Sequence, residues 1–353
     1  MKSTKFIIAL LFAVLPLMAC GTQKANMQTI QTAVKTSHTQ GNGMERRNLS
    51  LGKFCNIEAE NNVQVIFTQS STNSIVAEAT PEEFDRYKIE VTGQTLHVYL
   101  PTKRSSKIRV NNIGPEMRLY VSAPSLSGLN LSGTSTFTTT RLTADKALSL
   151  TLSGSTAATL GDLNSTDAVN IDASGASKIS MQKLDCRALA TALSGAAELK
   201  LAQIVAKAEV TSTLTAACKM LVESINANRL DLMMYGSSSF ESPKDNKDCK
   251  IMIDCSGETL VQMSGVGKAK MNLSAPQTTI TASGTADVCM TFKGKEAQME
   301  CSGTATIEAD LDCERLQAVN SGCGDMKMQG TADDVKISGS GVSHIDTSKL
   351  NKF

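Results

Sequence analysis

Apolar and small residues return at fixed distances around a repeated Ser-Gly pair from residue 131 to the end of the chain. In the segment 301–309 (CSGTATIEA), a small residue precedes Ser-Gly, and apolar or small residues stand four and six places after the glycine. Apolar positions that alternate with polar ones are typical of a strand with one buried face. We take this glycine as the mark of each repeat. The marks are Gly133, Gly154, Gly175, Gly195, Leu214 in a degenerate copy, Gly236, Gly257, Gly265, Gly284, Gly303, Gly322 and Gly341.

A period near twenty residues predicts a solenoid, in which each unit covers the apolar face of its neighbour. A low-complexity linker would also be rich in Ser, Gly and Thr, but it would not keep apolar residues in register with its glycines. A leucine-rich repeat has the same period, yet its successive leucines and Asn/Cys ladder are missing. We therefore predict an all-β fold, a parallel β-helix of about a dozen coils stacked ~4.8 Å apart.

The spacing of the marks is irregular at one place. The intervals are 21, 21, 20, 19, 22 and 21 residues up to Gly257, then 8 to Gly265, and then 19 four times. Because eight residues cannot form a coil, either Gly257 or Gly265 is a false mark, or the solenoid is interrupted. A charged insertion lies just before this place, at 243–248. We expect a change of cross-section, or a break into two sub-stacks, near 240–265.

The segment 50–130 precedes the repeats and shows a simpler alternation. Apolar residues fall at every second position in 63–67, 75–79, 89–91, 96–100 and 117–121, which predicts short strands. Residues 81–86 fit one short helical turn. We expect 50–130 to form a β cap that covers the open end of the solenoid, with the β-helix itself running over 131–353.

The first twenty residues have the layout of a processing signal. Lys2 and Lys5 precede a short apolar core that ends near Pro16, and the segment closes with Leu-Met-Ala-Cys-Gly at 17–21. This end resembles the bacterial lipobox, so we expect Cys20 to carry a lipid. A plain secretory signal with a chance cysteine is the alternative. Residues 21–49 are polar and predict a tether, and the absence of acidic residues after Cys20 favours the periplasmic side of the outer membrane over the cell surface.

Composition and charge exclude some classes of partner. The chain has 353 residues, 41% of them hydrophobic, which is enough for a large core, and its formal net charge of +1 gives no reason to expect nucleic acid. The three histidines, His38, His97 and His344, show no spacing that suggests a metal or a proton relay. Acidic pairs at 310/312 and 333/334 fit solvated turns better than calcium sites. We expect no cofactor and no metal.

Nine cysteines remain after Cys20, and they show no zinc or redox spacing. Cys255 and Cys301 stand two places before a mark, where other repeats have leucine or alanine, and Cys218 and Cys289 fall in the apolar stretch after one. Buried free cysteines behave as small apolar residues. We therefore predict packed thiols rather than a redox site.

Several motifs together resemble a known family. They are Val-x-Val-x-Phe-x-Gln at 63–69, Gly-Gln-Thr-Leu-x-Val at 93–98, Leu-Tyr-Val-x-Ala-Pro-x-Leu at 119–126, the serial Leu-Ser-Gly-x-Ser repeats and the ending Ser-His-Ile-Asp-Thr-Ser-Lys-Leu at 343–350. The chain is similar over 50–350 to the Bacteroidetes family of putative autotransporter adhesins with a head GIN domain. The resemblance implies a right-handed β-helix and an adhesin-like role, and it supplies no catalytic or binding residue.

Two classes of function fit this sequence. The first is a non-enzymatic, lipid-anchored envelope module that binds a protein or glycan or has a structural role. The second is a carbohydrate-active β-helix enzyme, a polysaccharide lyase or hydrolase, but no cluster of carboxylates is apparent and the chain has no Trp. We expect binding without turnover, and no catalytic residue is assigned. The candidate contact loop comprises Pro243, Lys244, Asp245, Asn246, Lys247 and Asp248. The sequence does not indicate an oligomeric state.

Overall fold

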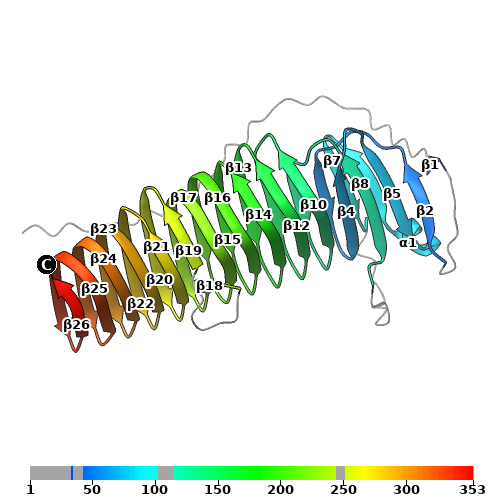
Figure 1. Cartoon of the computed structure of the whole chain (residues 1–353). Helices are drawn as coiled ribbons and strands as arrows, with labels where there is room; N and C mark the ends of the chain where they lie inside the picture. The colour runs from blue at the N-terminus through cyan, green and yellow to red at the C-terminus, as the bar shows by residue number, and fades with distance from the viewer. Residues whose placement is uncertain (1–32, 35–42, 102–113, 244–250, 353) are drawn as a thin grey trace, which may run out of the picture. The chain divides into compact units, whose positions relative to one another are not determined.

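The computed structural model describes residues 33–34, 43–101, 114–243 and 251–352. Strands make up 73% of the chain and helix 2%, and the strands wind into a β-solenoid of about 11 turns. The coils stack in one column that runs from the N-terminal strands to β26 at the far end (Figure 1). The predicted all-β parallel β-helix is confirmed.

Eight strands and one short helix precede the repeats. They are β1 (Ala33–Val34), β2 (Glu45–Leu49), β3 (Asn56–Ala59), β4 (Val63–Gln69), β5 (Ser74–Ala79), α1 (Pro81–Arg86), β6 (Lys88–Thr92), β7 (Thr95–Tyr99) and β8 (Met117–Ala123). All five stretches with period-two alternation form strands, as predicted. The helical turn is also present, and the Thr80 hydroxyl caps it by accepting a hydrogen bond from the Glu83 N–H.

The repeats form the remaining strands, and in the later coils a single long strand bends around the coil. They are β9 (Gly128–Leu131), β10 (Thr136–Ala144), β11 (Leu148–Leu152), β12 (Ala157–Ser165), β13 (Ala168–Ala173), β14 (Lys178–Cys186), β15 (Ala188–Leu193), β16 (Glu198–Leu214), β17 (Lys219–Gly236), β18 (Ser239–Glu241), β19 (Ile251–Cys255), β20 (Glu258–Gly265), β21 (Lys268–Ser274), β22 (Gln277–Gly284), β23 (Asp287–Gly303), β24 (Thr306–Gly322), β25 (Asp325–Gly341) and β26 (His344–Lys352).

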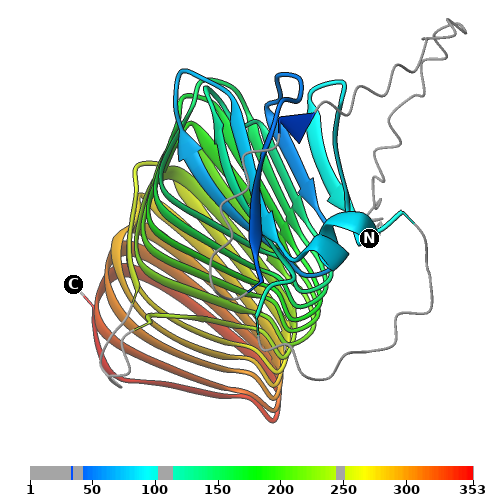
Figure 2. The ribbon, with the colours of Figure 1, turned by 90° about the vertical axis from the view of Figure 1, so that its right-hand side faces the viewer.

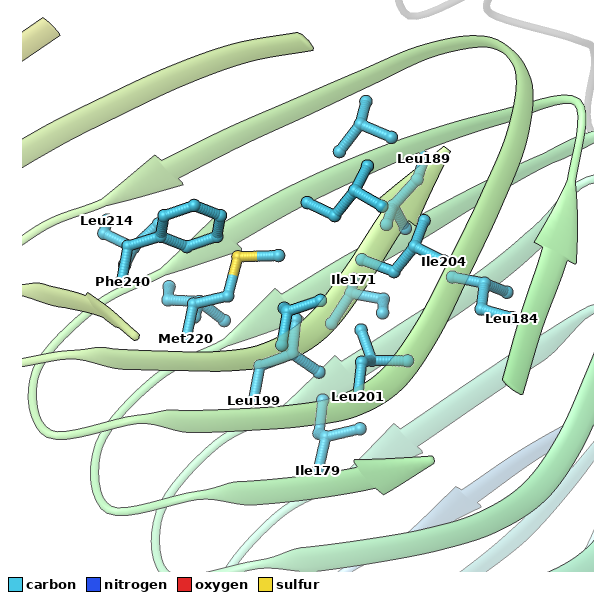
Figure 3. Packing of buried hydrophobic residues seen from close by; sticks show 14 of the residues in the cluster. Ile171, Ile179, Leu184, Leu189, Leu199, Leu201, Ile204, Leu214, Met220 and Phe240 are labelled. Atoms are coloured by element: carbon cyan, nitrogen blue, oxygen red, sulfur yellow. The ribbon is translucent and has the colours of Figure 1, made fainter. Parts of the chain in front are cut away.

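Each coil pairs in parallel with the next, and equivalent residues stack in columns. Leu199 pairs with Met220, and Met220 pairs with Phe240, so the position four places after the mark forms one buried column. Figure 3 shows these three side chains pointing into the interior beside one another. This column is the apolar position that the sequence repeat predicts, and each coil therefore hides the core face of its neighbour.

The marks themselves are corners at which the backbone takes a left-handed conformation. Gly154 has φ +82°, and a Cβ there would lie 2.6 Å from the Gly133 carbonyl oxygen, so glycine is needed both for conformation and for space. The degenerate mark predicted at Leu214 is wrong. Leu214 pairs with Leu193 inside the coil, and the left-handed corner is Ala216, with φ +68°.

The irregular spacing comes from one long coil. Gly265 pairs with Gly236 and with Gly284 and has φ +107°, whereas Gly257 has no such conformation, so Gly257 is the false mark. Leu221 pairs with Glu241, but Ser224 pairs with Met252, so the coil gains eight residues between β18 and β19. The pairing from β17 through β19 and β20 to β21 and β22 is uninterrupted. The expected break into two sub-stacks is therefore wrong.

The N-terminal segment closes the solenoid with antiparallel strands. β8 pairs with β5, β5 with β2 and β7 with β6, all antiparallel, and α1 lies at the same end (Figure 2). β3 and β4, however, pair in parallel with β9 and β10, and Asn61 between them has the left-handed corner conformation, with φ +71°. The coils therefore begin before residue 131, inside the segment expected to form the cap.

Candidate binding surface

Large apolar side chains reach the surface at the long coil. Among the described residues, five large hydrophobic side chains are exposed: Tyr235, Met252, Val266, Ile337 and Val342. Three of these five border the long coil or lie in it. The outer faces of the coils before it carry mainly Ser, Thr, Ala and charged residues, so this cluster is a local departure from the repeat.

Four of the side chains on this coil and its neighbour form what we call the apolar patch: Met233, Tyr235, Leu260 and Val266. Met233 and Tyr235 lie on β17, and Tyr235 pairs with Ser264 on β20. Leu260 also lies on β20, two residues before Gln262, which is the partner of Met233. Val266 follows the Gly265 corner, where its N–H donates to the Gly236 carbonyl. Tyr235 is 40% exposed and Val266 60%, while Met233 and Leu260 are half-buried.

Polar groups surround the apolar patch. The Arg229 guanidinium lies 2.9 Å from Asp231 and 3.5 Å from Glu258, at one side of it. Thr213 pairs with Met233 on the preceding coil, and Thr279 pairs with Leu260 on the following one. An exposed aromatic residue within a polar rim is the arrangement typical of binding hot spots.

The candidate contact loop leaves the same coil at a different place. Pro243, just after β18, is half-buried, whereas Lys244, Asp245, Asn246, Lys247 and Asp248 lie outside the described residues. The insertion falls between Glu241 and Met252, whereas the apolar patch lies on the second half of β17, on β20 and at the following corner. The loop and the apolar patch are thus separate features of one coil.

A hollow of about 320 Å³ in the N-terminal part is lined by acidic residues, including Glu58, Glu60 and Glu90. Two of these groups, Glu58 and Glu90, have internal partners. Glu58 lies 2.8 Å from His97 Nδ1, and Glu90 accepts hydrogen bonds from Lys88 and from the Tyr99 hydroxyl. The hydrogen bond from Lys88 lowers the pKa of Glu90, so Glu90 is suited neither to donate a proton near neutral pH nor to act as a strong base.

The sequence reasoning missed the contact between Glu58 and His97. Both residues occupy outer positions of alternating strands, and they come together because β3 and β7 pair in parallel with Glu58 opposite His97. The alternation alone could have shown that both side chains point outward, but not that the two strands are neighbours.

A second hollow, of about 270 Å³, lies near the C-terminus, over β23 to β26. Three of its charged groups have partners: Lys327 Nζ lies 3.1 Å from Glu308, and the Gln329 amide donates to Asp310 over 3.1 Å. Within the described ranges, no group of three or more His, Cys, Asp or Glu residues is placed to hold a metal ion.

Most of the cysteines that the structure describes are core residues. Cys186, Cys218, Cys255, Cys301 and Cys313 are buried free thiols, while Cys55 and Cys289 are half-buried and Cys323 is exposed. The expectation that Cys289 packs in the core is wrong, because it lies on the outer side of β23 between the inward-facing Val288 and Met290. Cys255 is buried as expected, but it pairs with Ala227 at a different corner, because Gly257 is not a mark.

Burial makes the deepest thiols poor nucleophiles. Desolvation raises the pKa of Cys186 and of Cys255 to about 12, and the neighbouring carboxylates Asp185 and Asp254 add to the shift. Since only the thiolate is reactive, these residues behave as small core side chains.

No helix in the described part of the chain has both the length and the apolar character needed to cross a membrane. None of the curated proteins matches the chain. Several solved structures are similar to it. A putative adhesin from Bacteroides fragilis NCTC 9343 is 15% identical and has a TM-score of 0.30, with 86% of this chain and 95% of that chain covered.

A putative lipid binding protein from Parabacteroides distasonis ATCC 8503 is 14% identical, with a TM-score of 0.32 and coverage of 89% and 98% of the two chains. A putative adhesin from Parabacteroides merdae ATCC 43184 is also 14% identical, with a TM-score of 0.29 and coverage of 88% and 100%.

The family model described as "Putative auto-transporter adhesin, head GIN domain" matches residues 53–242 and 271–352. The matched ranges include the N-terminal strands from β3 onward and nearly all of the coils, and the gap between them falls on most of the long coil, including its insertion. The chain therefore belongs to the family of putative auto-transporter adhesins with a head GIN domain.

Proposed function

We propose that this protein is a non-enzymatic, adhesin-like binding module of the cell envelope, and that the apolar patch is its contact surface for a protein or glycan. The observation that carries the proposal is the exposed Tyr235 ring, which lies two residues after Met233 on β17, while Leu260 lies on the neighbouring strand and the exposed Val266 at the following corner. An aromatic ring can stack on a sugar face or insert into a protein pocket, and either contact removes apolar area from water. The family membership supports a binding role.

The long coil also suits recognition because it differs from the rest of the stack. The family model leaves residues 243–270 unmatched, and these residues hold Leu260 and Val266. Regular coils can serve as a rigid scaffold, while one divergent coil presents side chains that are not part of the family pattern. Binding residues commonly lie on such variable segments.

The experiment compares the binding of wild-type protein and a Tyr235→Ala variant to arrayed envelope and host glycans and to host matrix proteins. A hot-spot aromatic contributes at least ~2 kcal/mol, so the variant should bind roughly thirtyfold more weakly or worse. Lys178→Ala, on the outer side of β14, is the matched surface control and should bind normally. A ligand bound equally by wild type and Tyr235→Ala would remove the apolar patch from the proposal.

Replacement of Pro243 to Asp248 by a short Gly/Ser turn tests the contact loop separately. The stack runs on through β17, β19 and β21, so the fold should remain intact. If the loop contributes a second contact, the replacement weakens the same ligand without lowering the melting temperature. Unchanged binding would confine the contact to the apolar patch.

The alternative, a carbohydrate-active enzyme, requires a carboxylate free to act as acid or base. The carboxylates Glu58 and Glu90 of the N-terminal hollow are held by His97, Lys88 and Tyr99. We expect incubation with envelope and host polysaccharides to release no reducing ends and no unsaturated products. Time-dependent cleavage that a single carboxylate substitution abolishes would establish the enzyme instead.

The membrane attachment rests on Cys20, which lies outside the described residues. We propose that its thiol carries the lipid and that the protein sits on the periplasmic side of the outer membrane. Cys20→Ser should move the protein from the detergent phase to the aqueous phase in a partition experiment. Proteinase added to intact cells should leave the protein uncut, and cleavage there would place it on the cell surface.

A further inference from the structure

The C-terminal end of the stack is an incomplete coil. β26 pairs with residues 325–332 of β25 only, apart from Met328 at a bulge, while residues 333–341 pair with β24 on one side. Among the residues that the structure describes, no strand pairs with 333–341 on the other side. A row of backbone N–H and C=O groups is therefore available for another strand.

The core is open along the same edge. On β24, Leu316 and Ala318 are 1% and 0% exposed, but their partners on β25 are the half-buried Val335 and Ile337, which is 37% exposed. Val342, at the last corner, is 82% exposed. Unpaired backbone and exposed core side chains thus coincide, which is the combination that favours pairing with another chain.

The other end of the stack lacks this feature. There, β5 and β6 pair antiparallel with the outermost coil strands β8 and β7, and β2 covers the next edge. The contrast between the two ends is visible in Figure 1, where β26 is the last strand of the column. Within the described ranges, antiparallel strands of the chain cover the N-terminal end, and no strand covers the outer edge of β25 at residues 333–341.

Because the last coil is half complete, the stack is one strand taller on one side than on the other. Two copies of such an end are complementary in shape. On one side of the coil, β26 forms the last layer of the stack, beyond β25. On the other side, the last layer is the edge 333–341 of β25, one layer short of β26. A two-fold axis perpendicular to the stack, which exchanges the two sides of the coil, brings each copy's β26 against the other copy's 333–341 edge. The strands on the two sides of a coil run in opposite directions, and this axis exchanges the sides without turning the strands around. Both pairs are therefore antiparallel, and every free edge strand gains a partner.

The charges agree with this arrangement. An antiparallel pair lays the start of one strand against the end of the other. The edge begins with Asp333 and Asp334, both exposed, and β26 carries the exposed Lys349 near its end. Opposite charges therefore meet at both symmetry-related pairings.

We propose that a second copy of this chain docks here, so that two molecules join end to end through their C-terminal coils. The contact is closed by its symmetry, so it yields dimers and not filaments. In such a dimer, the two caps and the two apolar patches lie on opposite sides of the junction, and each ligand-binding surface is present twice.

The test uses the full chain with Cys20→Ser, so that no lipid can bring copies together. Sedimentation equilibrium from micromolar to near-millimolar concentration should show a monomer–dimer equilibrium. Ile337→Lys puts a charge into the open core and should weaken the dimer at least ~30-fold, in line with the cost of a buried unpaired charge. The control Ser338→Lys, on the outer side of the same strand, should leave the dimer unchanged.

Exchanging the charges of Asp334 and Lys349 provides a second test, which also works if the Ile337→Lys variant unfolds locally at the last coil. Asp334→Lys should weaken the dimer, Lys349→Asp should do the same, and the two together should restore it. Amides of 333–341 should also exchange more slowly as the protein concentration rises. A monomer at all concentrations, a dimer indifferent to Ile337→Lys, protection confined to another surface, or no restoration in the double variant would each overturn the proposal.

Discussion

At the scale of single residues, one corner position decides whether each coil can close. The chain must enter a left-handed conformation there, and glycine provides it in most coils. Two coils use another residue, Asn61 with φ +71° and Ala216 with φ +68°. Asparagine tolerates this region better than alanine does, so Ala216 is the least favourable corner of the stack.

Ala216→Gly should therefore stabilise the protein. The left-handed conformation costs alanine ~1–2 kcal/mol, and glycine returns part of that through its larger chain entropy in the unfolded state. The expected gain is up to ~1 kcal/mol in the free energy of unfolding, measured by denaturant titration. The reverse change at a regular corner, Gly154→Ala, should destabilise by more, because its Cβ also meets the Gly133 carbonyl at 2.6 Å. If Ala216→Gly and Gly154→Ala change the free energy of unfolding in the same direction, the left-handed conformation does not set the residue preference at these corners.

The buried thiols predict a loss of stability at high pH. The folded-state pKa of Cys186 and of Cys255 is raised to about 12, above the ~8.5 of an unfolded cysteine. A group of this kind stabilises the fold fully below the unfolded pKa and loses that contribution as the pH rises through the folded one. The free energy of unfolding should therefore fall between pH ~9 and ~12.

Cys186→Ala combined with Cys255→Ala provides the control for this pH dependence. Alanine fits these positions, because Cys186 pairs with Ala206, and Cys255 with Ala227, in the same column. The double variant should show a shallower decline above pH 9, measured by denaturant titration at each pH. An identical decline in both proteins would assign the effect to other groups.

Sequence alone located most of the corners, since Ser-Gly marks them, but it placed the fifth mark, Leu214, two residues too early. The glycine there is replaced by Ala216, and Leu214 stands in the apolar column that pairs with Leu193. A left-handed alanine leaves no signal in the residue pattern, so only the backbone could correct the register. The contact between Glu58 and His97 was hidden for a related reason, because the alternation does not say which strands are neighbours.

At the scale of the element, the strand register places buried apolar residues of one coil next to buried apolar residues of the next coil. Val288 pairs with Ile307, both fully buried, in β23 and β24. Val288→Asp or Ile307→Asp buries an unpaired carboxylate and should cost several kcal/mol, about 3 or more, in the free energy of unfolding. Thr306→Asp, next to Ile307 on the outer side, is the control and should change stability little. Unchanged melting of the core variants would place these residues at the surface.

Whole coils should be removable because each one repeats the same register. Deletion of 284–302 joins the coil marked by Gly265 to the coil marked by Gly303, and both place apolar residues at equivalent positions. We expect a folded protein whose unfolding free energy drops by about one coil's share. Deletion of only 284–293 shifts the register and should prevent a cooperative transition, measured by circular dichroism. Equal damage from both deletions would argue against independent coils.

The long coil shows what the spacing of the repeats could and could not predict. The charged insertion predicted a disturbance near 240–265, and the structure has it there as eight extra residues in one coil. The predicted break is absent, because the insertion leaves between β18 and β19 while the flanking strands keep their partners. The apolar patch was not predicted, since only the pairing of β17 with β20 places Leu260 and the corner before Val266 next to the strand that carries Tyr235.

At the scale of the whole stack, contacts are made only between neighbouring coils, so stability should vary along the column. The N-terminal end is closed by antiparallel strands, whereas the C-terminal end exposes Ile337 and Val342. In a one-dimensional stack, a defect near an open end unfolds only the coils beyond it, while a defect in the middle disturbs both halves.

Met326→Asp, in β25, should therefore release only the last coils, whereas Leu160→Asp, in β12, should lower the main unfolding transition. Both wild-type side chains are almost fully buried, so the local cost of the new charge is similar and the position in the stack decides the outcome. Hydrogen exchange at low protein concentration should show faster exchange in β24, β25 and β26 of the Met326→Asp variant, and wild-type rates in β10 to β16. If Met326→Asp lowers the main transition as much as Leu160→Asp does, the coils unfold as a single unit and the open end is as strongly coupled as the middle.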